Sequence, residues 1–175
     1  MSPPLVIRFL ASKGLARRTL GRIAFAPAPM HERADTFLAM PMDEPDPGAD
    51  ALRGHAAVLL EQGRQRGSEW PTDLPSVEGF ANMRALSADD VVVADPRSCA
   101  VQILFRPDSP HNALFITNRC NSRCLMCPQP PTKADDGWLL DENQRLLALI
   151  RHAPEALGIT GGGANTLGRW AAASS

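Results

Sequence analysis

Three of the four cysteines lie close together, in the segment Cys120-Asn121-Ser122-Arg123-Cys124-Leu125-Met126-Cys127. The short apolar run Ala113–Thr117 precedes them. Thiols spaced four and three residues apart on one loop can converge on a common point, and deprotonated sulfur is the ligand that zinc and iron–sulfur clusters take from proteins. The spacing therefore predicts a metal centre, and its three thiolates leave one coordination position open to a substrate or cofactor.

The sequence around the cysteines predicts a strand, a helix and a second strand. Ala113–Thr117 is the first strand, and the second is Ala156–Thr160, which runs into Gly161-Gly162-Gly163. Between them we expect a helix that Asp141 caps and that ends near His152. Its predicted buried stripe consists of Leu146, Leu147, Leu149 and Ile150. Strands joined in this way are parallel, so the cysteine loop and the glycine run are expected at one edge, where α/β folds bind ligands.

The residues that flank the cysteines make the pattern more specific. Cys-x3-Cys-x2-Cys after a short strand is the pattern of radical S-adenosylmethionine (SAM) enzymes. Within that superfamily, the segment from Phe115 to Pro131 resembles the radical SAM maturases of the His-Xaa-Ser repeat peptide systems. The subgroup is suggested by Leu125-Met126 and then Gln129-Pro130-Pro131. The resemblance covers residues from about 86 to 162, and three further segments agree with it: Phe105-Arg106, His111-Asn112 and Leu157–Gly162.

The resemblance implies a set of site residues and two cofactors. Each of the three metal ligands would bind one iron of a [4Fe–4S] cluster, and the fourth iron would take the amine and carboxylate of SAM. Reductive cleavage of SAM would then give methionine and a 5′-deoxyadenosyl radical, which abstracts hydrogen from a ribosomally made peptide. The residues implied are Cys120, Cys124 and Cys127 for the cluster, Met126 for the adenine, through its backbone, and Gly161 and Gly162 beside the SAM amine.

The resemblance also implies protein partners, and the composition argues against nucleic acid and membranes as partners. A peptide substrate, a companion radical SAM maturase and an electron donor such as a flavodoxin or ferredoxin are expected. The formal net charge of −1 predicts no binding to nucleic acid or to an anionic membrane. No stretch approaches the roughly 18 consecutive apolar residues of a transmembrane helix. Four cysteines without a disulfide pattern favour a reduced, cytoplasmic location.

Two departures from the family lead to a second interpretation. The family continues the Gly-Gly pair with Glu-Pro-Thr, whereas this chain has Gly163-Ala164-Asn165, so the acid that would accept a hydrogen bond from the SAM ammonium is absent. The family core is a partial barrel of βα units, of which this sequence has the first unit and the second strand. A C-terminally truncated, inactive copy is therefore an alternative to the active maturase.

A structural zinc site is the alternative from a different class. Zinc takes cysteine and histidine at close spacing and needs a fourth ligand in a closed site. The candidates for that ligand are Cys99, His111 and His152. In this interpretation the cysteine loop would stabilise an interaction module. Cys99 itself is otherwise predicted to be a buried or incidental thiol.

Residues 1–108 are predicted to form a separate, loop-rich α+β accessory domain, and 109–175 the truncated radical SAM core. The linker is placed at Asp108–His111. The overall prediction is an α/β protein in which an incomplete radical SAM (β/α) barrel follows the accessory domain in the sequence. Expected elements of that domain are strands at Leu5–Leu10 and Arg22–Ala26, a helix at Ala51–Gln65, and a hairpin of Val91–Ala94 and Val101–Phe105 with its turn at Asp95–Ser98.

Overall fold

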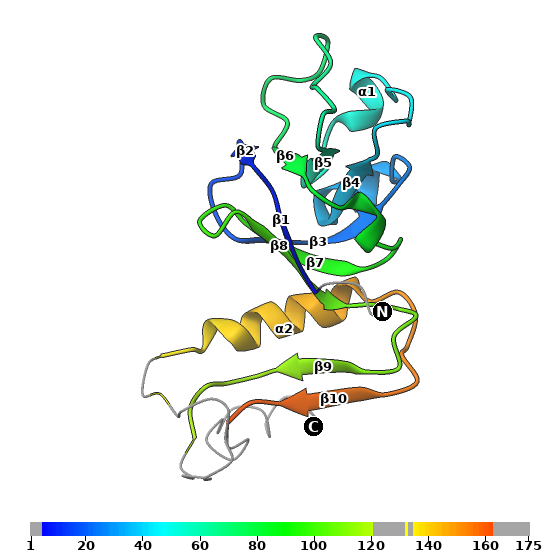
Figure 1. Ribbon diagram of the computed structural model, residues 1–175. Helices are drawn as coiled ribbons and strands as arrows, with labels where there is room; N and C mark the ends of the chain where they lie inside the picture. Colours follow the sequence, from blue (N-terminus) through cyan, green and yellow to red (C-terminus); the bar gives the residue numbers. More distant parts are fainter. Residues whose placement is uncertain (1–4, 121–131, 133–134, 163–175) are drawn as a thin grey trace.

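The computed structural model describes residues 5–120, 132 and 135–162 (Figure 1). The described part is a mixed α/β structure dominated by strands. Its first eight strands are β1 (Val6–Arg8), β2 (Ala11–Lys13), β3 (Thr19–Ala24), β4 (Thr36–Met40), β5 (Ala57–Glu61), β6 (Ser76–Phe80), β7 (Val91–Asp95) and β8 (Ala100–Phe105). They form one sheet in the order β1-β8-β7-β3-β4-β5-β6-β2. Three short helical segments connect them: η1 (Met30–Asp35), α1 (Ala49–Leu52) and η2 (Met83–Ala85).

The first segment of the chain closes this sheet into a barrel. β1 pairs antiparallel with β8, and β2, which follows after only Phe9 and Leu10, pairs antiparallel with β6. The two intervening residues bond in the same way, because Phe9 N–H donates to the Cys99 carbonyl and Leu10 N–H donates to the Glu78 carbonyl. One bent segment therefore joins both ends of the sheet and removes its exposed edges.

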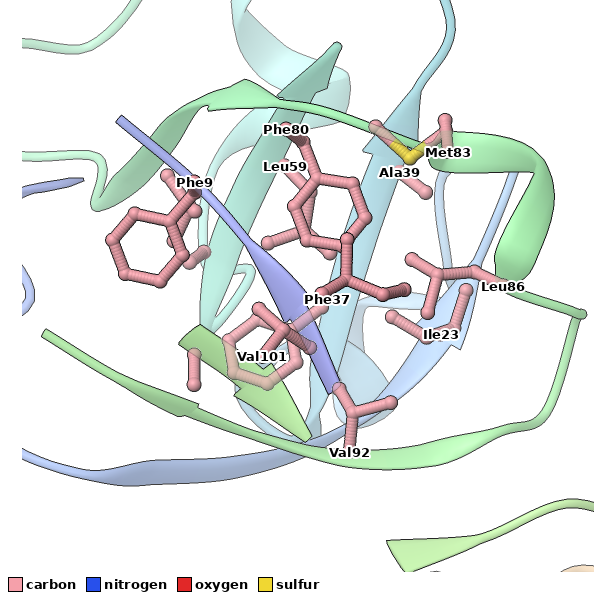
Figure 2. Close-up of a cluster of buried hydrophobic side chains, with 14 of the residues drawn as sticks. Phe9, Ile23, Phe37, Ala39, Leu59, Phe80, Met83, Leu86, Val92 and Val101 are labelled. Carbon is pink, nitrogen blue, oxygen red and sulfur yellow. The ribbon is translucent and has the colours of Figure 1, made fainter. Parts of the chain in front are cut away.

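The barrel interior is the largest hydrophobic cluster of the described chain (Figure 2). Phe37 and Phe80 are completely buried at its centre, and Ile23 is 1% exposed. The side chains that Figure 2 labels come from several strands and from the β1–β2 and β6–β7 connections, and they all point inwards: Phe9, Ile23, Phe37, Ala39, Leu59, Phe80, Met83, Leu86, Val92 and Val101. Burial of this much apolar surface stabilises the barrel.

The predicted helix over Ala51–Gln65 is wrong. α1 ends at Leu52, Gly54 takes a φ of +82°, and the chain continues as β5. β5 pairs in parallel with β4 on one side and β6 on the other, and it is buried on both faces from Ala57 to Leu60. A strand buried on both faces has a continuous apolar run without alternation. Some residues of such a run fall at helical spacing by chance, so the run can be mistaken for a helix.

The predicted hairpin is confirmed. β7 and β8 pair antiparallel from Val91↔Phe105 to Asp95↔Ala100. Cys99 closes the turn with a φ of +49°. The predicted strand at Leu5–Leu10 contains β1, and the predicted strand at Arg22–Ala26 overlaps the end of β3.

The predicted strand–helix–strand unit is also confirmed. β9 (Asn112–Phe115) leads to α2 (Trp138–Leu149) and then to β10 (Leu157–Thr160). β9 and β10 pair in parallel, with Leu114 opposite Ile159, and both strands end on the same side of the molecule in Figure 1.

Two details of the predicted helix are wrong. α2 begins at Trp138, so Asp141 lies in its first turn rather than at its cap, where a negative charge still interacts favourably with the helix dipole. Leu147 is 40% exposed and does not belong to the buried face. That face consists of Leu139, Asn143 and Leu146, with Leu149 and Ile150 packed at its margin.

α2 packs against both the barrel and β9. Leu146 of α2, Leu114 of β9 and Leu20 of β3 belong to one hydrophobic cluster. The remaining buried members of the cluster are Val91, Val93, Phe105 and Ile116. The predicted domain boundary at residue 108 thus falls between segments that share a continuous core.

The connection from β8 to β9 is held by hydrogen bonds. The Asn112 side chain accepts from Arg106 N–H at 2.9 Å and donates to the carbonyls of Arg106 and Ser109. The Arg106 guanidinium binds both oxygens of Asp90, which is completely buried, and these bonds raise the pKa of Arg106. This network fixes where β9 begins.

α2 is twelve residues long. Across the ranges that the structure describes, none of the helices combines the length and the apolar character needed to cross a membrane.

Candidate functional site

The chain that leaves β9 stays beside the chain that leaves β10. Ile116 N–H donates to the Thr160 carbonyl at 3.0 Å, and Gly162 N–H donates to the Thr117 carbonyl at 2.7 Å. These two bonds extend the parallel pairing past the ends of both strands. As a result, Cys120 lies next to the glycine pair.

The close approach requires glycine at both positions. Gly161 has a φ of +124°, and a Cβ added there would lie 2.6 Å from the Thr117 carbonyl oxygen. A Cβ on Gly162 would overlap the Arg119 carbonyl and would lie 3.2 Å from Cys120 Cβ. The structure therefore places Gly162 beside Cys120, and Gly161 precedes it in the same turn, so three of the predicted site residues lie together.

A buried hydrogen-bond network holds the first residues of the cysteine loop. Thr117 is completely buried, and its hydroxyl donates to Asp136 Oδ2 at 3.0 Å. The same carboxylate oxygen accepts from Asn118 N–H at 2.5 Å, and Thr117 Oγ1 accepts from Arg119 N–H at 2.9 Å. Asp136 is 6% exposed and lies two residues before α2. The network thus links the exit of β9 to the entry of α2.

Asn143 provides a second link between β9 and α2. Its side-chain amide donates to the Phe115 carbonyl at 2.9 Å and to the Leu139 carbonyl at 2.7 Å, and the residue is 6% exposed. A carbonyl at the end of β9 is thereby satisfied by a side chain rather than by another strand.

Sequence reasoning did not identify Thr117, Asp136 or Asn143 as parts of this region. The sequence predicts Thr117 only as the last residue of a strand. The available signals were a hydroxyl residue directly after an apolar run and a carboxylate just ahead of the helix. A polar residue four positions after Leu139, on the same helix face, was a third signal.

The other predicted site residues lie outside the described part of the chain. Cys120 is partly buried, whereas Cys124, Met126 and Cys127 belong to the segment 121–131 that the structure does not describe. Among the residues that it does describe, no group of three or more His, Cys, Asp or Glu side chains is arranged to hold a metal ion. Two of the three predicted thiolates are not among those residues.

The candidates for a fourth zinc ligand are all described. Cys99 is partly buried against the barrel core, and its thiol donates to the Pro96 carbonyl at 3.6 Å. His111 and His152 are exposed. Cys99 thus has the local contacts expected of an incidental, partly buried thiol.

Comparison of the chain with protein-family models, with curated proteins and with solved structures finds no match in any of the three.

Proposed function

We propose that the chain binds a [4Fe–4S] cluster through Cys120, Cys124 and Cys127 and uses it, with SAM, to modify a ribosomally made peptide. The proposal rests on the cysteine spacing, on the flanking residues that resemble the maturases of His-Xaa-Ser repeat systems, and on the β-α-β unit that carries the loop.

The observation that carries most weight is the contact between the glycine turn and the backbone that leads to Cys120. Parallel β9 and β10 end on one side, and glycine alone fits at both positions of the turn, because Gly161 lies against the Thr117 backbone and Gly162 lies against the Arg119 carbonyl beside Cys120. In α/β folds the carboxyl ends of parallel strands are the usual ligand-binding edge. Cys120 and a glycine turn at that edge support a site for a metal-bound cofactor.

The donor set suits an iron–sulfur cluster with an open iron. Thiolates are the ligands of such clusters, and three of them leave one iron for an exchangeable ligand. In this proposal Gly161 and Gly162 border the SAM amine, and Met126 contacts the adenine through its backbone. When bound, the cluster supplies the electron for reductive cleavage of SAM.

The roles of the described residues follow from their contacts. Thr117 and Asp136 hold the backbone that leads to Cys120, and the glycine pair leaves space for that backbone. An electron donor such as a flavodoxin or ferredoxin, and a companion maturase, would be the protein partners.

Anaerobic reconstitution with iron and sulfide tests the proposal. The purified chain should bind about four irons and acquire a broad visible absorption. After reduction and addition of SAM, 5′-deoxyadenosine should accumulate, as measured by chromatography with mass detection. Bound zinc without iron or colour would overturn the proposal in favour of a zinc module, and a cluster without SAM cleavage would indicate an inactive copy.

A pair of cysteine variants makes the test specific to the loop. Cys120→Ala should lose most of the bound iron, because a cluster held by two thiolates is far weaker. Cys99→Ala is the matched control and should retain the iron, since the Cys99 thiol contacts the Pro96 carbonyl at the β7–β8 turn. Equal iron loss in both variants would contradict the assignment of the ligands.

A further inference from the structure

β9 is hydrogen-bonded to a neighbouring strand on one edge only. β10 pairs with it along Asn112–Phe115, and within the described ranges no strand pairs with the opposite edge. In Figure 1, β10 lies on the outer side of β9, whereas α2 and the barrel lie on the other side. The unpaired edge of β9 therefore faces the interior side of the unit rather than its rim.

Successive residues of β9 point their backbone groups to alternate edges, and this identifies the groups at the unpaired edge. Ile116 N–H points to β10, because it donates to the Thr160 carbonyl. Neighbouring residues of a strand point their N–H and C=O groups to opposite edges, so those of Ala113 and Phe115 point away from β10. The contact from Asn143 to the Phe115 carbonyl agrees with this direction. The groups available at the edge are the N–H and C=O of Ala113 and the N–H of Phe115.

A groove of about 930 Å³ borders this edge. Leu104 and Phe105 of β8 line one side, and Trp138 and Leu139 of α2 line another. Ala113 and Phe115 lie along it, and it extends to Asn118, two residues before Cys120. Its volume is that of a typical ligand site, and apolar and polar side chains contribute to its lining in similar numbers.

We propose that the unpaired edge of β9 binds an extended peptide as an added strand, in the groove between β8 and α2. Unsatisfied N–H and C=O groups at a strand edge are the chemistry that recognises a peptide backbone in strand form. Residues of β8 and α2 line the groove on two sides, so the edge is better suited to one extended chain than to the sheet of a folded partner. A single extended chain is the occupant that fits.

The groove also determines where the bound peptide leads beyond β9. Asn143 already occupies the Phe115 carbonyl, so backbone pairing stops at that residue. The next peptide residues pass Asn118, unpaired, towards Cys120. Naming this peptide as the substrate rests on the proposed function, whereas the binding itself requires neither iron nor SAM.

Hydrogen exchange on the full chain, without metal, tests the binding. The probe is a synthetic peptide of His-Ala-Ser repeats. Two versions of the same peptide serve as controls, and each is N-methylated at alternate residues so that one of its two edges cannot donate hydrogen bonds. With saturating probe, the amides of Ala113 and Phe115 should exchange about tenfold more slowly, whereas Leu114, which points to β10, serves as the internal reference. Exchange at Ala113 and Phe115 that is unchanged by the probe overturns the proposal, whether or not the probe binds elsewhere.

A pair of proline variants locates the binding edge. Ala113→Pro removes an N–H that β10 does not use and should weaken binding of the labelled probe about tenfold or more, measured by fluorescence anisotropy. Ile159→Pro makes the same change at the outer edge of β10 and should leave binding unchanged. The hydrogen-exchange measurement on the unmodified chain tests the proposed binding edge even if a proline variant does not fold.

Two further outcomes separate the alternatives. Protection of Ala113 and Phe115 that appears without peptide and grows with protein concentration would mean that a second copy covers the edge, which overturns the proposal. Failure of iron binding or SAM cleavage would reject the proposed function and would leave the peptide-binding result unaffected, because that result is obtained on the metal-free chain.

Discussion

The Thr117 hydroxyl donates a hydrogen bond to Asp136 Oδ2 at 3.0 Å, and both side chains are buried. The two residues are 19 positions apart and lie on either side of the cysteine loop. Because the same oxygen also accepts from Asn118 N–H, one carboxylate fixes the direction in which the chain leaves β9. The position of Cys120 depends on this contact.

Thr117→Val should destabilise the chain by about 1–3 kcal/mol, because the buried Asp136 carboxylate loses a donor and Arg119 N–H loses its acceptor. Urea unfolding measures this change. Thr160→Val is the matched control, since Thr160 is exposed, and its free energy of unfolding should change by less than about 0.5 kcal/mol. Equal stability of both variants and the unmodified chain would mean that the network contributes nothing.

Gly162→Ala should lower both stability and iron binding, because the added Cβ would overlap the Arg119 carbonyl and force Arg119 and Cys120 away from β10. We expect a loss of more than about 1 kcal/mol in urea unfolding. Gly158→Ala is the control, since its Cβ would meet Ala113 and Asn112 at an ordinary 3.5 Å. If the two alanine variants reconstituted with equal iron content, the glycine contact would be irrelevant to the site.

The β-α-β unit could be predicted from the sequence because each of its elements has a local signal. Ala113–Thr117 and Ala156–Thr160 are short apolar runs, and the leucines between them have helical spacing. Parallel pairing then follows from the connection itself. The placement of Gly161 and Gly162 beside Cys120 follows in turn from the parallel register, which needs no knowledge of side-chain packing.

The barrel could not be predicted in the same way. β5 is an apolar run buried on both faces, so its pattern did not distinguish it from the helix expected there. β1 and β2 close the sheet through partners 63 to 96 residues away, and no local pattern specifies such contacts. Thr117 and Asp136 were missed for a related reason, because their contact depends on how α2 approaches β9.

Arg106→Ala should destabilise the chain by about 3–5 kcal/mol, because it leaves the completely buried Asp90 carboxylate without its bidentate partner. The Asn112 contacts to the connection remain in the variant, because they are made to the Arg106 backbone. Thermal and urea unfolding measure the change. Arg53→Ala, which removes an exposed pair with Asp50, should have almost no effect. A small effect at Arg106 would show that the connection is held by Asn112 alone.

Stability should fall as the pH drops below about 6.5, the ordinary pKa of histidine, because of His55. His55 is 3% exposed, Nε2 accepts from Ala28 N–H, and Nδ1 donates to the Leu52 carbonyl. Burial lowers the pKa of His55; the bond to Leu52 opposes that shift and the charge of Arg33 adds to it. The unfolded chain therefore binds a proton at a higher pH than the folded chain does.

The His55 contribution is complete above the unfolded pKa and is lost as the pH falls towards the folded value, with a slope of at most about 1.4 kcal/mol per pH unit. Urea unfolding at a series of pH values measures it. His55→Gln should remove this part of the slope, whereas His31→Gln, at an exposed position, should not. An unchanged slope in His55→Gln would assign the pH dependence to other groups.

The proposed function requires that three thiolates leave one iron open to SAM. Electron paramagnetic resonance of the reduced, reconstituted chain tests this requirement, with spectra recorded before and after SAM is added. We predict a [4Fe–4S] signal that changes on addition of SAM and that Cys120→Ala abolishes while Cys99→Ala preserves it. A signal that SAM leaves unchanged, or a chain that takes up zinc and forms no cluster, would contradict the proposed function.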